Sequence, residues 1–212
     1  MIEASTTATT TKFNPHASPS TLNVINLWAG PGAGKSTTAA GLFNLMKLAG
    51  LKVELVTEFA KDLTYQRDYG SLTNSLHLLG EQDHRLRRLV GHVDWCITDS
   101  PLPLSSAYVG PEYGDWFHAA VTGAYSRYTN WDFLVLRVKD YQHYGRNQTA
   151  SQAMALDNVI ANLFFDFTED EEGIEPVNAW EIAGDIHAPY AVAERLPIPA
   201  LHQSINLGGT KI

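Results

Sequence analysis

One short segment of the chain has residue types and spacing that predict a specific chemistry. It consists of Gly30, Pro31, Gly32, Ala33, Gly34, Lys35, Ser36 and Thr37, and it matches the pattern G-x-x-x-x-G-K-[ST] at every fixed position. Glycines let successive backbone N–H groups turn inward around phosphates, and a following helix adds the positive end of its dipole. We therefore expect Lys35 to reach the β- and γ-phosphates of ATP and the Ser36 hydroxyl to bind Mg²⁺.

The segments on either side of this loop fit that interpretation. Residues 21–28 alternate between apolar and polar types, which predicts a strand before the loop. Residues 36–49 place apolar side chains at helical spacing, which predicts a helix after it. A strand, a glycine loop and a helix in this order are the context that the motif requires.

Two acidic residues each follow a predicted strand downstream of the loop. Residues 52–57 are followed by Glu58, and the apolar run 93–99 ends in Asp99. The carboxyl ends of parallel strands face the ligand crevice, so we expect Asp99 to hold Mg²⁺ and Glu58 to act on the acceptor hydroxyl. The alternatives are structural: Glu58 as a charge in the first turn of a helix, and Asp99 as a helix cap.

A charged helix is predicted between these two acids. Leucines at helical spacing predict one helix over residues 71–90, with Gln82 and Arg85 on other faces. Such a charge cluster is usual on a solvated helix face. From a helix beside the crevice, Gln82 and one arginine could also contact the acceptor.

The connector 101–128 is rich in aromatic residues and is interrupted by glycine and proline. Tyr108, Tyr113 and Trp116 are therefore candidates for stacking on a base. The alternative is that these rings pack in the core.

A polar and basic segment, about 139–149, follows the strand predicted over 131–138 and is expected to form a lid. Its arginines would close over the transferring phosphoryl group. The candidates are Arg137, Lys139 and Arg146, and Arg146 is favoured because the glycine before it permits movement.

Strands that alternate with helix-length segments predict an α/β fold, a P-loop NTPase-type three-layer sandwich with a mainly parallel five-stranded sheet. The kinase-like domain is expected to span residues 21–196. Residues 1–20 are rich in Thr, Ser and Ala and are expected to form a disordered leader. Residues 197–212 are expected to form a loose tail.

Composition restricts the class of protein. The chain has 212 residues, of which 44% are hydrophobic, enough for one buried domain. The single cysteine, Cys96, excludes a disulfide framework and fits a cytoplasmic location.

The sequence also bears on possible partners. No run approaches the roughly 18 apolar residues of a membrane helix, so no membrane partner is expected. The net charge of −8 argues against a broad nucleic-acid-binding surface but allows a local basic groove. The oligomeric state stays open, with a dimer among the options.

Taken in order, four motifs make the chain resemble the thymidylate-kinase-like group of P-loop kinases. They are GPGAGKST, TEFAKDL, LLGEQDHRLRRL leading into WCITDSPL, and YGRNQ, and the resemblance covers residues 22 to about 190. The versions with Thr-Glu-Phe-Ala and Thr-Asp-Ser-Pro are most similar to phage 5-hydroxymethyluracil DNA kinases. The resemblance implies transfer of the ATP γ-phosphate to the hydroxymethyl group of that base in phage DNA, a step of thymine hypermodification in the host cytoplasm.

The chain also departs from thymidylate kinases at two places. Asp99-Ser100 stands where they usually have Asp-Arg, and Thr57-Glu58-Phe59 stands where they usually have Arg-Glu-Pro. Both changes fall where the phosphate of a nucleotide acceptor would be held, which favours an acceptor hydroxyl that is not on a phosphate. The alternatives are a soluble nucleoside or nucleotide kinase, and an NTPase or non-catalytic nucleotide-binding switch. A GTPase is not expected, because the chain has no Asn-Lys-x-Asp motif.

Overall fold

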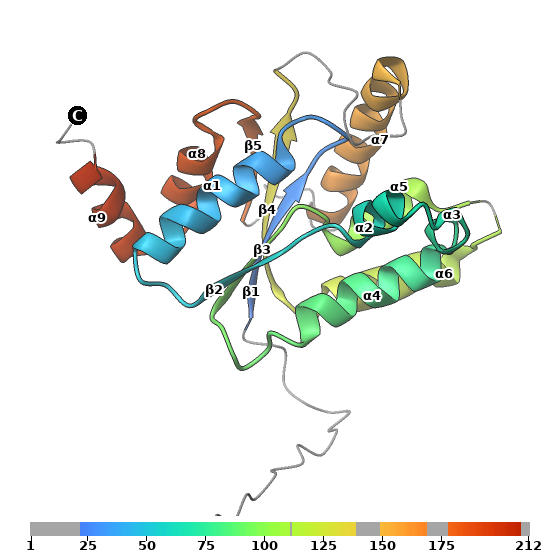
Figure 1. The fold of residues 1–212 in the computed structure, drawn as a ribbon, viewed down its shortest axis with the longest axis horizontal. Helices are drawn as coiled ribbons and strands as arrows, with labels where there is room; N and C mark the ends of the chain where they lie inside the picture. Colours follow the sequence, from blue (N-terminus) through green and yellow to red (C-terminus); the bar gives the residue numbers. More distant parts are fainter. Residues whose placement is uncertain (1–21, 111, 139–148, 169–177, 209–212) are drawn as a thin grey trace, which may run out of the picture.

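A computed structural model describes residues 22–110, 112–138, 149–168 and 178–208. Within these ranges, strands form one five-stranded sheet in the order β2-β3-β1-β4-β5, and every neighbouring pair is parallel (Figure 1). The predicted α/β architecture with a parallel five-stranded sheet is thereby confirmed. The strands are β1 (Asn23–Trp28), β2 (Val53–Val56), β3 (Trp95–Thr98), β4 (Thr129–Leu136) and β5 (Ala179–Ala183).

Helices cover both faces of the sheet and complete the three layers (Figure 1). One face carries α1 (Lys35–Leu48), α8 (Ala188–Arg195) and α9 (Pro199–Gly208). The other face carries α4 (Ser75–Arg87), α6 (Asp115–Tyr125) and α7 (Ala150–Thr168). Short helices connect the strands to these: α2 (Phe59–Gln66) and α3 (Tyr69–Leu72) follow β2, and η1 (Leu102–Leu104) and α5 (Ser105–Tyr108) follow β3.

The central strand β1 shows why the sheet is covered on both sides. Ile25 and Leu27 belong to the hydrophobic core beneath α1 and α8. Val24 points to the opposite core with α4 and α6, and Trp28 packs with α7. Successive side chains of a strand point to opposite faces, so a strand with apolar side chains on both faces must be covered on both.

The predicted single helix over residues 71–90 is wrong. The structure has two helices, α3 and α4, separated at Asn74, whose side chain accepts a hydrogen bond from the backbone N–H of His77 at 3.0 Å. Asparagine favours such a cap because its oxygen satisfies an N–H that the first helical turn leaves without a partner. Of the leucines and valine predicted to share one stripe, Leu79 is buried, whereas Leu76 and Val90 are exposed.

The C-terminal segment from residue 197 is also more ordered than the sequence predicts. Residues 199–208 form α9, and Ile198 and Leu201 are buried in the core shared with α1. Pro199 opens the helix, a position where its missing N–H costs nothing. The expected leader 1–20 and most of the expected lid lie outside the described residues. In the described part of the chain, no helix has both the length and the apolar character needed to cross a membrane.

A buried acid fixes the end of β1 that leads into the glycine loop. Asp132 of β4 is 3% exposed and accepts hydrogen bonds from Trp28 Nε1 at 2.7 Å and from the Tyr125 hydroxyl at 2.6 Å. Burial raises the pKa of Asp132 to about 6, although these hydrogen bonds act in the opposite direction. The folded protein therefore binds this proton more tightly than the unfolded chain.

This shift predicts a loss of stability as pH rises. A carboxyl whose pKa is raised by folding contributes its full stability below its ordinary pKa, and that contribution is lost as pH rises through about 6. When the pH rises from 4.5 to 7.5, the ionisation of Asp132 is expected to lower the free energy of unfolding by about 2 kcal/mol. Asp132→Asn should remove this component, and the exposed-site control Asp166→Asn should keep it. Urea titrations of the three proteins at both pH values test this, and equal pH dependence in all three would contradict it.

Candidate active site

The glycine loop lies between β1 and α1, as the sequence predicts. Gly32 and Gly34 have φ angles of 83° and 117°, a region that favours glycine. Gly34 is the N-cap of α1 and has no side chain to accept from the first helical N–H groups. The loop therefore presents backbone donors and the positive end of a helix to the same place, which is the requirement for binding phosphate.

The Lys35 ammonium group is held inside the loop. Its Nζ donates to the carbonyl oxygens of Ala29 at 2.6 Å and Gly30 at 3.1 Å. Burial lowers the pKa of Lys35, and the negative charges of Glu58 and Asp99 act in the opposite direction. A cation and two carboxylates from different strands therefore share one electrostatic environment.

Asp99 joins the loop to the neighbouring strand ends. One carboxylate oxygen accepts from the Ser36 hydroxyl at 2.5 Å, and the other accepts from the backbone N–H of Glu58 at 3.1 Å. A hydroxyl beside a carboxylate fits a Mg²⁺ ion, which prefers oxygen ligands and usually binds through one or two protein groups and the substrate phosphates. Among the described residues, no three or more His, Cys, Asp or Glu side chains converge on a possible metal position.

Glu58 has a fixed backbone and an uncommitted side chain. It is the N-cap of α2, but its side chain makes no cap hydrogen bond. Among the described residues, no donor forms a hydrogen bond with its carboxylate, and the one contact of Glu58 with Asp99 is made through the backbone N–H. Burial raises the pKa of Glu58, with Lys35 opposing the shift and Asp99 reinforcing it. A carboxylate of this kind next to a phosphate loop is suited to accept a proton.

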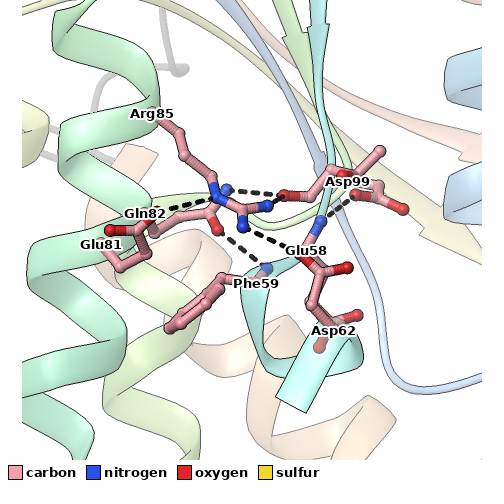
Figure 2. Close-up of polar contacts among 8 residues, drawn as sticks. Glu58, Phe59, Asp62, Glu81, Gln82, Arg85 and Asp99 are labelled. Atoms are coloured by element: carbon pink, nitrogen blue, oxygen red, sulfur yellow. Dashed lines mark hydrogen bonds and ion pairs between the residues drawn. The ribbon is translucent and has the colours of Figure 1, made fainter. Parts of the chain in front are cut away.

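Gln82 of α4 supports the turn that carries Glu58 (Figure 2). Gln82 is 5% exposed, so it is not on a solvated helix face. Its Oε1 accepts from the backbone N–H of Phe59 at 3.2 Å, and its Nε2 lies 3.4 Å from the Thr98 hydroxyl. These contacts place Gln82 behind the turn, and its contact with an acceptor stays a prediction.

Arg85 holds the same turn from one helical turn further along α4 (Figure 2). It donates to Asp62 at 2.8 Å and to Glu81 at 3.3 Å, and its guanidinium lies 4.9 Å from the centre of the Phe59 ring. The arginine therefore ties α4 to α2 through charge and ring contact. A role in binding the acceptor is not visible in these contacts and stays a prediction.

The three aromatic candidates occupy two different places. The Tyr113 and Trp116 rings lie near Phe117 at the start of α6, with centres 5.8 Å apart and planes tilted by 42°, and Trp116 is half exposed. Tyr108, at the end of α5, is also half exposed. Burial of its hydroxyl raises the pKa of Tyr108, and the charges of Glu58 and Asp157 raise it further. Stacking on a base stays a prediction for each of the three residues.

On the other side of the loop lies a pair of residues, Arg137 and Asp157, of which the sequence indicated only Arg137. Arg137, expected as a lid residue, forms an ion pair with Asp157 of α7, with Nε–Oδ2 and Nη2–Oδ1 distances of 2.7 and 3.0 Å. Asp157 was missed. Its signal in the sequence is that it is the one charged residue in the apolar stretch 150–165. The other lid candidates, Lys139 and Arg146, lie outside the described residues.

Comparisons with known proteins add little to this geometry. No family model matches the chain, and no curated protein matches it. A solved structure described as "Crystal structure of APE1195" is similar over 90% of this chain and 94% of its own, with 16% sequence identity and a TM-score of 0.34. A likeness this weak carries no argument about activity.

The contacts of Gln82 predict that it acts through the Glu58 turn. Gln82→Leu removes the acceptor for the Phe59 N–H, so we expect kcat to fall by about 10-fold while the Kd for ATP stays within about 2-fold. Gln82→Glu keeps that acceptor oxygen and should retain most of kcat. Steady-state kinetics and calorimetric ATP binding on both variants check this. A weakened ATP affinity with an unchanged kcat would instead make Gln82 part of the nucleotide site.

Proposed function

We propose that this protein is an ATP-dependent kinase that transfers the γ-phosphate to a hydroxyl group. The observation that carries the proposal is that the carboxylate of Asp99, directly after β3, joins the segments that follow β1 and β2. Asp99 binds the Ser36 hydroxyl of the loop on one side and the backbone of Glu58 on the other. The groups to which we assign phosphate binding, metal binding and proton acceptance thus lie at the carboxyl edge of a parallel sheet, where such folds bind ligands.

The loop and Lys35 would bind and orient the phosphates of ATP. The N-terminus of α1 would supply backbone N–H donors, and Lys35, which is already held in the loop, would supply a positive charge. Ser36 and Asp99 would hold Mg²⁺, which supplies charge stabilisation for the phosphates when it is bound. The proposal therefore assigns the binding of ATP and of Mg²⁺ to neighbouring residues.

Glu58 would take the proton from the acceptor. As the acceptor oxygen forms its bond to the γ-phosphorus, the bond from that phosphorus to the β–γ bridging oxygen breaks, ADP leaves, and the hydroxyl proton passes to the Glu58 carboxylate. Its pKa is raised by burial, which makes it a stronger base than an exposed glutamate. The opposing charge of Lys35 favours the ionised form that a base requires.

For the acceptor, we propose the 5-hydroxymethyl group of hydroxymethyluracil in DNA. Support comes from the resemblance of the segments around Glu58 and Asp99 to phage DNA kinases, and from the half-exposed ring of Tyr108, whose pKa is raised by burial and by the charge of Glu58. A base displaced from the duplex could stack on such a ring. Three arginines near the end of α4, Arg85, Arg87 and Arg88, could offer a local positive charge to DNA. Arg87 and Arg88 are exposed, whereas Arg85 is engaged with α2. A soluble nucleotide or nucleoside acceptor is the second candidate, favoured by the net charge of −8.

Two substitutions should separate phosphate binding from proton transfer. Lys35→Ala should abolish turnover, because the transferring group loses its pre-placed cation. Glu58→Gln should lower kcat by about 10²–10⁴-fold with ATP binding almost unchanged. The exposed-site control Glu194→Gln should match the unmodified protein. A coupled assay of ADP release and calorimetric ATP–Mg²⁺ binding measure these effects, and loss of ATP–Mg²⁺ binding in Glu58→Gln would assign Glu58 to the metal site instead.

The acceptor proposal predicts labelled phosphate in DNA. With γ-labelled ATP, we expect incorporation into a duplex that contains hydroxymethyluracil, and less of it as salt rises. The comparison is free hydroxymethyldeoxyuridine monophosphate under the same conditions. Labelling of the mononucleotide alone would reject the DNA acceptor. Release of ADP without any acceptor would indicate an NTPase, and no release would indicate a nucleotide-binding module.

A further inference from the structure

The ion pair between Arg137 and Asp157 contacts the beginning of the phosphate loop directly. Arg137 Nη2 donates to the carbonyl oxygen of Pro31 at 2.8 Å. Asp157 Oδ1 accepts from the backbone N–H of Gly30 at 3.1 Å. The pair therefore holds both a donor and an acceptor of the first two loop residues, from the end of β4 on one side and from α7 on the other.

The position of Asp157 explains why the loop begins with a glycine. A Cβ atom on Gly30 would collide with the Asp157 carboxylate and would lie 3.1 Å from the carbonyl oxygen of Ala153. The carboxylate cannot easily move away, because the Arg137 guanidinium binds it through two parallel contacts. The first glycine of the motif is thus matched to a particular side chain of α7.

Electrostatics gives the pair a second consequence. A carboxylate that touches the loop backbone would repel the phosphates of a nucleotide, and Arg137 compensates that charge at the same place. The side chains are 14% and 28% exposed for Arg137 and Asp157, so solvent screens this interaction only in part. Both charges also act on Lys35.

We propose that Asp157 is a positioning residue for the phosphate loop: paired with Arg137, it fixes the first loop peptides in the arrangement that binds ATP. This inference rests on the proposed function, since it assumes that the loop binds a nucleoside triphosphate. In this role Arg137 keeps Asp157 oriented and its charge compensated, and it is not itself a ligand of the phosphates.

The role can be tested with four variants of the full chain. Asp157→Ala removes the acceptor for Gly30, and we expect the Kd for ATP to rise by about 10-fold. Asp157→Asn keeps an acceptor oxygen and should stay within about 3-fold. Arg137→Met leaves the carboxylate uncompensated beside the phosphates and should raise the Kd by about 10- to 100-fold. The double variant Arg137→Met, Asp157→Asn should return to within a few-fold of Asp157→Asn alone, because the repelling charge is gone.

Calorimetric ATP binding on each variant gives the Kd, with Asp166→Asn on the same helix as the control. Melting temperatures without nucleotide separate a loss of folding from a loss of affinity. If Arg137→Met does not fold, the comparison of Asp157→Ala with Asp157→Asn still decides the matter.

Three results would overturn the proposal: an unchanged Kd in Asp157→Ala, an equal weakening in Asp157→Asn and Asp157→Ala, or a double variant as weak as Arg137→Met. The last would make Arg137 a direct phosphate ligand. If the unmodified protein itself does not bind ATP, the proposed function is contradicted. This measurement uses the unmodified protein alone, so it is distinct from the three results on the variants.

Discussion

The buried carboxylate of Asp99 is the group on which the site depends. A carboxylate removed from water must have its oxygens hydrogen-bonded, since burial without partners costs several kcal/mol. At 4% exposure, Asp99 meets this requirement with the Ser36 hydroxyl and the Glu58 N–H. The two hydrogen bonds of this one acid therefore fix the start of α1 relative to the turn after β2. They bring the glycine loop and the second acid, Glu58, together.

The two acids of the site have opposite environments. Asp99 is hydrogen-bonded through both oxygens, whereas the side chain of Glu58 forms no cap on its own helix, and its partial burial raises its pKa. The backbone of the Glu58 turn is held by Gln82 and Arg85 instead. Helix α4 thus holds the backbone of the turn, and the Glu58 carboxylate is not used for that purpose. This arrangement suits the proposed role of Glu58 toward a bound acceptor.

The loop is held from its other side by residues that the strand and helix patterns do not reveal. Asp132 binds Trp28 at the end of β1, and Asp157 binds Gly30 at the start of the loop. Both acids lie in segments whose spacing predicts only a strand or a helix. What makes them part of the loop's support is the pairing of β1 with β4 and the packing of α7 beside that pair.

The sequence alone determined the elements with strong local signals: the strand–loop–helix unit, the parallel α/β sheet, and acids at the ends of β2 and β3. These depend on periodicity and on residues close in sequence, and local physics decides them. Only the tertiary structure decided that Asn74 divides a predicted helix, that Gln82 faces inward, that the C-terminal helix joins the core, and that Asp157 reaches Gly30 across 127 residues. A contact between distant residues depends on how the strands are ordered and how the helices cross them. A one-dimensional pattern does not encode that order directly, because many packings satisfy the same local preferences.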